Sequence, residues 1–267
     1  MVYTFDGTLD GLLTAVFDTF ERQECPESLL TTGDALPLFC DGVHEVVTDE
    51  ARAQRVWRGL EKRLSREAVR LIAVGWLSEM QELNNPLYRY ICKVFQQKAD
   101  APSIERNFAD PDVLEVTNIA RKVLHEQLRM KQFIRFQKAK DGTYLAVVSP
   151  DHNVLPLIID HFADRFRDQP WLIYDAHRHY GYYYDGEDST PVGKHLPVRI
   201  TLEDESAVPF NLDNGKLDEE VLSSDDQLLQ DLWRTYFKAI CIRERINPRK
   251  QLSDMPRRYW KYMTEKQ

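Results

Sequence analysis

The chain has 267 residues, a formal net charge of −8 and a hydrophobic fraction of 43%. This length can bury a sizeable core, in one large domain or two small ones, and the composition is that of an ordinary soluble globular protein. No apolar run approaches the roughly 18 residues of a membrane-spanning helix, so we expect no membrane association.

The N-terminal sequence and the cysteine content indicate the cellular compartment. The opening sequence MVYTFDGTLDG lacks the basic and apolar regions of a signal peptide. The four cysteines are far apart and form no CxxC pair, which predicts reduced thiols and argues against a zinc ribbon or an iron–sulfur cluster. We therefore expect a cytoplasmic protein with no metal and no prosthetic group.

The first half of the chain is predicted to be mostly helical. A short strand at 2–5 is closed by the turn pair Asp6-Gly7, and Thr8 can cap a helix whose apolar positions recur at helical spacing as far as Phe20. Residues 25–49 are expected to be irregular. Further helices are predicted at 50–63, at 65–82, at 86–98 and from Asp110-Pro111 to Lys131.

After Lys131 the hydrophobic pattern changes from a helical to an alternating period. Strands are predicted at 133–137, 143–148, 171–174 and 180–184, and residues 196–201 are a further candidate strand. A helix from Asp151 to Arg167 is predicted between the second and third strands. The Asp/Glu-rich residues 185–224 are predicted to be an acidic surface excursion, and the last helices to cover Asp225–Arg243 and Met255–Glu265.

These elements predict an α/β fold of the α+β-like kind. We expect one compact domain over 1–267, with a largely helical N-terminal half and a small, mainly antiparallel sheet flanked by helices. The strands of that sheet are expected to be 2–5, 133–137, 143–148, 171–174 and 180–184.

The C-terminal residues combine positive charge with aromatic rings. From Arg234 to the end there are ten Lys/Arg against three Asp/Glu, and Trp233, Tyr236, Phe237, Tyr259, Trp260 and Tyr262 lie before and between these charges. Cations attract phosphates and flat rings stack on unpaired bases, although a basic helix face is more often simply solvated. The candidate nucleic-acid-binding residues are Arg234, Lys238, Arg249, Lys250, Arg257, Arg258 and Tyr259.

A second candidate site gathers around the helix predicted at 151–167. His161 and Arg165 lie four residues apart at the edge of its apolar stripe, which would suit a phosphate clamp or, equally, a histidine hydrogen-bonded to a nearby carbonyl. Because sites gather at strand ends and helix starts, we add three neighbours to these two as catalytic candidates: His152, Asp175 and Arg178.

Sequence motifs for familiar enzyme classes are missing. His125-Glu126 is followed by Arg129 where a zinc protease needs its second histidine, and there is neither a phosphate-binding glycine loop nor a GxSxG motif. No residue spacing in the chain specifies a reaction.

Six blocks in order resemble a bacterial family described as DNA metabolism or DNA repair proteins. They include Tyr3-Thr4-Phe5-Asp6-Gly7, Pro150-Asp151-His152-Asn153 and Met255-Pro256-Arg257-Arg258-Tyr259-Trp260, and the similarity extends over nearly the whole chain except about 185–224. The resemblance implies a functional link to a radical-SAM repair protein and, in some chains, fusion to a uracil-DNA glycosylase. It implies no catalytic residues.

Together these observations predict a DNA metabolism or repair accessory that binds DNA and works with a partner repair enzyme. Two alternatives remain open. One is a nucleic-acid hydrolase, lyase or base-processing enzyme that uses the His/Arg/Asp corner. The other is a protein-interaction module whose acidic stretch 185–231 docks a partner's basic surface.

Overall fold

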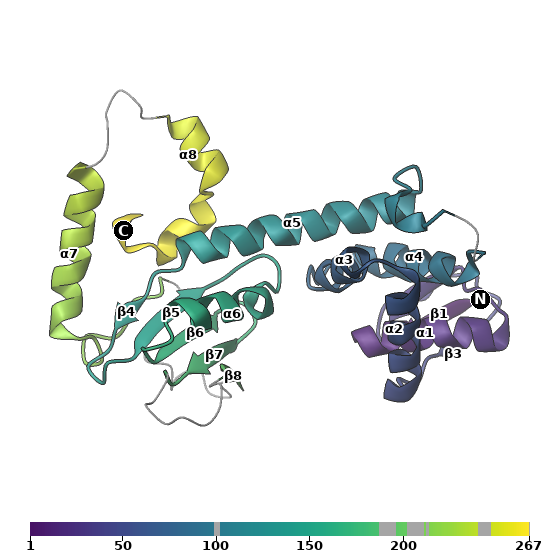
Figure 1. Ribbon diagram of the computed structural model, residues 1–267. Helices are drawn as coiled ribbons and strands as arrows, with labels where there is room; N and C mark the ends of the chain where they lie inside the picture. The colour runs from purple at the N-terminus through teal and green to yellow at the C-terminus, as the bar shows by residue number, and fades with distance from the viewer. Residues whose placement is uncertain (99–101, 187–195, 202–210, 212–213, 240–246, 267) are drawn as a thin grey trace. The chain divides into compact units, whose positions relative to one another are not determined.

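The structure is a computed structural model that describes residues 1–98, 102–186, 196–201, 211, 214–239 and 247–266 (Figure 1). It has two compact units, Met1–Leu124 and His125–Gln267, and the boundary falls within helix α5, Pro111–Phe133. The mixed α/β fold with a helix-rich N-terminal half is confirmed, whereas a single compact domain over 1–267 stays a prediction.

The N-terminal unit contains a three-stranded parallel sheet in the order β2-β1-β3, formed by Ser28–Thr31, Val2–Phe5 and Val43–Glu45. Two expectations are wrong. Residues 2–5 were expected to pair with the later strands but pair within this sheet, and residues 25–49 were expected to be irregular but contain two strands. These strands have three or four residues, and strands in parallel sheets do not show the alternating pattern that marks a half-exposed strand.

Helices surround this sheet and start where the sequence places polar caps. Thr8, Asp49 and Ser65 each accept a hydrogen bond from a first-turn backbone N–H. The helices are α1 Leu9–Arg22, α2 Glu50–Arg63, α3 Arg66–Trp76 and α4 Asn84–Gln96, with short 3₁₀ turns η1 Gln81–Leu83 and η2 Ile104–Arg106. The helix expected at 65–82 therefore ends at Trp76.

The start of α5 is held to α4 by a buried carboxylate. Asp112 accepts from Arg89 at 2.6 Å (Nη2 to Oδ1) and from Lys93 at 2.7 Å (Nζ to Oδ2), and Lys93 also contacts Asp110 at 2.6 Å. Burial alone would raise the pKa of Asp112, but these two cations hold it below its ordinary value. The pairs fix the register between the two helices within the N-terminal unit.

The C-terminal unit contains a five-stranded, mostly antiparallel sheet in the order β4-β5-β6-β7-β8. The parallel pair β5/β6 is connected through helix α6, Leu155–Arg165. The strands are β4 Gln137–Lys138, β5 Tyr144–Val148, β6 Trp171–Asp175, β7 Tyr180–Tyr184 and β8 Val198–Thr201. The strand predicted at 133–137 is corrected, because α5 continues to Phe133 and the strand starts at Gln137.

Part of the acidic stretch 185–224, which was predicted to be a surface excursion, packs against this sheet. The Gln137 side-chain amide donates to the Gly215 carbonyl and accepts from the Leu217 backbone N–H at 3.1 Å, and Leu217 is buried. Residues 187–195, 202–210 and 212–213 lie outside the described residues, so the excursion predicted at 185–224 stays a prediction there.

The chain continues through α7 Ser224–Ala239 and α8 Pro248–Asp254 to two 3₁₀ helices, η5 Arg257–Tyr262 and η6 Thr264–Lys266. The helix expected at Met255–Glu265 is therefore two 3₁₀ segments, and α8 was not anticipated. Among the helices that the structure describes, none has both the length and the apolar character needed to cross a bilayer.

Candidate functional site

Asp175 and Arg178 form a buried ion pair at the end of β6. The Asp175 carboxylate is fully buried and accepts from Arg178 Nη1 at 2.9 Å and from the His177 backbone N–H at 2.9 Å. The Arg178 guanidinium also donates to the carbonyl oxygens of Pro150 and Asp151, at 3.0 and 2.9 Å. Burial raises the pKa of Asp175, and the adjacent Arg178 opposes that shift. The pair therefore holds the loop 150–153 onto the sheet.

The same loop is held from its other side by Glu126, on α5. This buried carboxylate accepts from the backbone N–H groups of Asp151 at 3.0 Å and His152 at 2.8 Å. Asn153 contacts the hydroxyl of Tyr180 through its side-chain oxygen. Backbone and side-chain groups of 150–153 thus serve as anchors, and the geometry gives Asp175 and Arg178 a structural role. A catalytic role for His152, Asp175 or Arg178 stays a prediction.

His161 and Arg165 lie away from this loop, toward the C-terminal end of α6. Arg165 is its last residue, so about 15 Å of helix axis separates it from the first residue, Leu155. The predicted corner is therefore not one constellation, because the loop and Arg165 lie at opposite ends of the helix.

The electrostatics of His161 and Arg165 bear on the phosphate clamp predicted for this pair. Burial lowers the pKa of His161, and the positive charges of Lys131 and Arg165 lower it further. The ring packs edge-on against Phe162 at 5.3 Å between centroids. His161 is thus a neutral ring at pH 7, and Arg165 supplies the positive charge.

Arg165 borders a cavity of about 590 Å³ in the C-terminal unit. Arg135 also borders this cavity, but its guanidinium is paired with Glu265 at 2.7 Å. Arg165 is exposed, lies 5.6 Å from the Phe166 ring centroid and has no ion pair among the described residues. Four of the lining side chains are aromatic: Phe136, Tyr144, Phe166 and Trp171. The lining also includes the carboxylate of Asp226, which accepts from the Lys138 backbone N–H and the Gln230 side chain, together with Gln132, Gln169 and Leu229. We call this the aromatic cavity.

Two of the C-terminal candidates, Arg258 and Tyr259, contact the buried carboxylate of Glu126, although the Arg258 side chain is 42% exposed. Arg258 donates to Glu126 at 3.2 Å (Nη2 to Oε1) and contacts the carboxylate of Asp151, while the Tyr259 hydroxyl donates to Glu126 at 2.6 Å. Tyr259 is only 3% exposed, so its ring is not available for stacking on a base. Both residues anchor η5 to Glu126 on α5, and Arg258 also contacts the loop 150–153 through Asp151.

Arg249, Lys250 and Arg257 are exposed. Lys250 pairs with Asp254 at 2.8 Å across one helical turn, and Arg257 lies 5.8 Å from the Trp260 ring centroid. Arg234 is half-buried on α7 and contacts Asp231 at 2.9 Å. The backbone of Lys238 belongs to α7, but its side chain lies outside the described part of the chain.

Two features of the site were missed by the sequence reasoning. Glu126 was considered only as part of a failed zinc motif, although a carboxylate on the apolar side of a long helix signals a buried partner. The aromatic cavity joins residues from α5 to α7, and no local pattern brings them together. Within the described residues, no three His, Cys, Asp or Glu side chains are grouped as metal ligands would be.

Residues 81–265 match a protein family described as a domain of unknown function, DUF4130. The chain belongs to this family. The family match starts at η1 and includes α4, α5 and the whole five-stranded sheet, so the loop anchors and the aromatic cavity lie within it. The family's description assigns no activity.

Among solved structures, the chain is similar to a pGpG-specific phosphodiesterase, PggH from Vibrio cholerae. The identity is 12%, the similarity covers 89% of this chain and 98% of that chain, and the TM-score is 0.29. That score is too low to carry an argument about fold or function. No curated protein matches the chain.

Proposed function

We propose that this protein is a nucleic-acid-binding accessory of DNA metabolism that works with a partner repair enzyme. The DNA context comes from the ordered sequence blocks that resemble DNA metabolism and repair proteins. Direct binding is supported by the chain's own residues. The described contacts favour binding over catalysis, because Asp175 and Arg178 already hold a loop.

The aromatic cavity is the observation that carries the proposal. Its volume of about 590 Å³ falls within the range of small-ligand pockets, and it is lined by several aromatic rings. Proteins that bind single strands combine rings that stack on bases with cations that contact phosphates. Arg165 supplies such a cation at the cavity, with no carboxylate paired to it in the described residues. A base could therefore stack inside while Arg165 contacts its phosphate.

The proposed partner is a radical-SAM repair protein or a DNA glycosylase, and the proposed compartment is the cytoplasm. Affinity purification of the full chain from cells exposed to a DNA-damaging agent, with partner proteins identified by mass spectrometry, tests this point. Recovery of a repair enzyme that is absent from the purification of an untagged control supports the accessory role. Recovery of none would leave only direct nucleic-acid binding to be tested.

Binding itself is tested by the fluorescence anisotropy of a labelled 20-nucleotide oligo-dT strand at several salt concentrations. We expect salt-sensitive binding by the wild-type chain, and Arg165→Gln should flatten the slope of log K against log salt by about 0.7. Arg167→Gln removes the same charge from an exposed residue two positions on that does not border the cavity, and should leave binding unchanged. Absence of binding to single-stranded and duplex DNA and RNA would overturn the proposal.

A further inference from the structure

The N-terminal unit has a groove of about 980 Å³ between α1, α2 and α4, separate from the site described above. Two kinds of side chain share it. Aromatic rings come from α1 and α4, and positive charges come from α2. The rings are Phe17, Phe20 and Phe95, and the positive charges are Arg55, Arg58, Lys62 and Arg63, of which Arg63 donates to the Val94 carbonyl at 3.4 Å. We call this the basic groove.

The periodicity of α2 explains why its charges line the basic groove. The helix buries Ala53, Val56 and Leu60, which face the core. Arg55, Arg58 and Lys62 follow the spacing i, i+3, i+7, so they share a second face of the same helix. All three side chains are exposed. The sequence pattern of one helix therefore produces a stripe of cations beside the rings.

Phe95 and Phe20 form the aromatic part of the groove. A Cβ atom at Gly59 would lie 2.7 Å from Cε1 of Phe95, so the glycine lets the Phe95 ring lie directly against the α2 backbone. Phe20 meets Phe95 edge-on, with ring centroids 5.9 Å apart, and remains 40% exposed. A large ring left exposed beside a packed ring offers a stacking surface.

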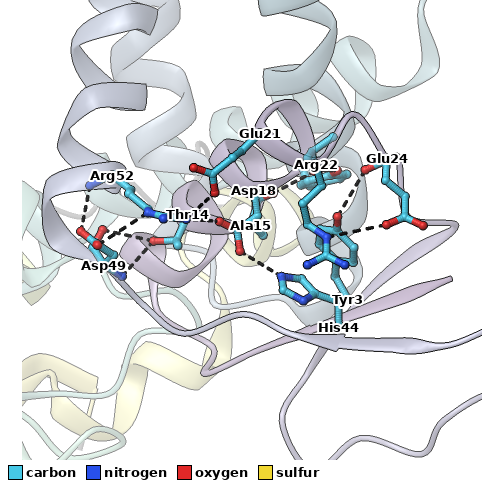
Figure 2. A network of polar contacts seen from close by, with 12 residues as sticks. Tyr3, Thr14, Ala15, Asp18, Glu21, Arg22, Glu24, His44, Asp49 and Arg52 are labelled. Atoms are coloured by element: carbon cyan, nitrogen blue, oxygen red, sulfur yellow. Dashed lines mark hydrogen bonds and ion pairs between the residues drawn. The ribbon is translucent and has the colours of Figure 1, made fainter.

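The described residues of the unit leave three positive charges of the basic groove without an acidic partner. Among the described residues, Arg55, Arg58 and Lys62 have no ion pair. Glu21 also borders the groove, but Arg52 contacts its carboxylate at 2.9 Å and bonds Asp18 at 2.8 Å with the same Nη1 atom, as Figure 2 shows. The groove therefore presents unpaired positive charge next to apolar rings.

We propose that the basic groove binds single-stranded nucleic acid, with phosphates on Arg55, Arg58 and Lys62 and a base stacked on Phe20. Its alternation of cations and rings matches a strand, in which negative phosphates and flat bases repeat together. An acidic peptide would satisfy the charges but supplies no regular flat ring for Phe20. The inference rests on the proposed function, because it assigns a second contact surface for the same class of ligand.

The test uses the full chain and the labelled oligo-dT strand. Changing Arg55, Arg58 and Lys62 together to Gln should flatten the slope of log K against log salt by about two, at about 0.7 per phosphate contact. Arg66, Arg70 and Lys122 are exposed residues of the same unit that do not border the groove. Changing those three to Gln removes equal charge and should leave the slope unchanged.

A second variant tests stacking independently of charge. Phe20→Ala should weaken binding about tenfold, the loss of one stacked base, and Phe20→Trp should restore it. Circular dichroism melting of both variants establishes that the unit is folded. Photo-crosslinking to bromodeoxyuridine in the strand should label peptides of α1, α2 or α4.

The outcomes separate the two proposals. Wild-type chain that binds no nucleic acid removes both the proposed function and the groove. Wild-type binding that the groove variants leave unchanged, with crosslinks confined to 125–267, overturns the groove alone. The groove proposal would also be overturned if poly-glutamate displaced the oligo-dT strand at equal charge concentration and Phe20→Ala left the affinity unchanged. Those two results would show that the groove binds polyanions or acidic peptides by charge alone.

Discussion

The hydroxyl of Tyr259 donates a 2.6 Å hydrogen bond to the buried carboxylate of Glu126, joining the chain's last turns to helix α5. The same carboxylate binds the backbone of Asp151 and His152. Burial and the Glu126 carboxylate raise the pKa of Tyr259 to about 12, so the hydroxyl keeps its proton at neutral pH. The Tyr259 hydroxyl is therefore one of the hydrogen-bond donors that satisfy the buried Glu126 carboxylate.

Tyr259→Phe should lower the free energy of unfolding by about 1–3 kcal/mol, because a buried carboxylate loses one hydrogen-bond donor. Urea unfolding followed by circular dichroism measures this change. Tyr183→Phe removes a hydroxyl from an exposed tyrosine of β7 and should change stability by less than about 0.5 kcal/mol. Equal stability of the two variants would contradict an anchoring role for Tyr259.

Two helical glycines should respond to alanine with opposite sign. A Cβ at Gly11 would lie 2.2 Å from Asp6 Oδ1 and 3.0 Å from Thr48 Oγ1, whereas a Cβ at Gly75 would meet Leu83 at 3.5 Å, an ordinary contact. Gly11→Ala should therefore displace the Asp6 carboxylate and destabilise the protein. Gly75→Ala should stabilise it by up to about 1 kcal/mol through helix propensity. Thermal melts of both variants decide the sign.

Local patterns predicted the elements whose signal lies within a few residues. The cap predicted at Thr8 marks the start of α1, and the helix predicted at 50–63 matches α2, Glu50–Arg63. The alternating residues 133–136 were misread because α5 carries its helical phase past Lys131 to Phe133. Strands β2 and β3 were missed because three or four residues define no period.

The site was harder to predict than the fold. The sequence placed His161 and Arg165 at the edge of the apolar stripe of their helix, but nothing local showed that burial and the charge of Lys131 lower the pKa of His161. Contacts between distant segments decide such properties. Arg257 and Arg258 look alike in sequence and both are exposed, yet Arg258 reaches Glu126 on α5 whereas Arg257 lies over the Trp260 ring.

Acid should weaken the contact between α4 and α5. The pKa values of Asp110 and Asp112 lie below the ordinary 3.8, because hydrogen bonds from Lys93, and for Asp112 also Arg89, outweigh burial. Their stabilising effect is thus present above pH 3.8 and is lost as pH falls below it. Lys93→Met should have a lower free energy of unfolding than the wild type at pH 7, and this difference in stability should become smaller below about pH 3.8. The control Lys122→Met should show no such narrowing in thermal melts.

The neutral state of His161 can be measured by its ring resonances in an NMR titration. Burial, Lys131 and Arg165 all lower its pKa from 6.5, so its contribution to stability is present above pH 6.5 and lost as pH falls through the folded-state pKa. Lys131→Met removes one repelling charge and should raise the pKa of His161. A pKa unchanged by Lys131→Met and by Arg165→Gln would show that burial alone sets it.

The three exposed cations of the C-terminal turns provide a test that separates binding from folding. Changing Arg249, Lys250 and Arg257 together to Gln should flatten the salt dependence of single-stranded DNA binding by about two units of slope, if each contacts a phosphate. Stability should hardly change, since among the described residues these cations form one ion pair, Lys250–Asp254, and both of its side chains are exposed.

Arg258→Gln makes the same change of charge one residue further along, but the expected result is different. Arg258 contacts the buried Glu126 and the carboxylate of Asp151, so its loss should lower the free energy of unfolding by about 1–3 kcal/mol. The slope of log K against log salt should remain that of the wild type at temperatures where the variant is folded. Urea melts and anisotropy titrations on both variants measure the two effects. A flattened slope without loss of stability in Arg258→Gln would instead place Arg258 on the nucleic acid, because a guanidinium that anchors the fold cannot be removed without loosening it.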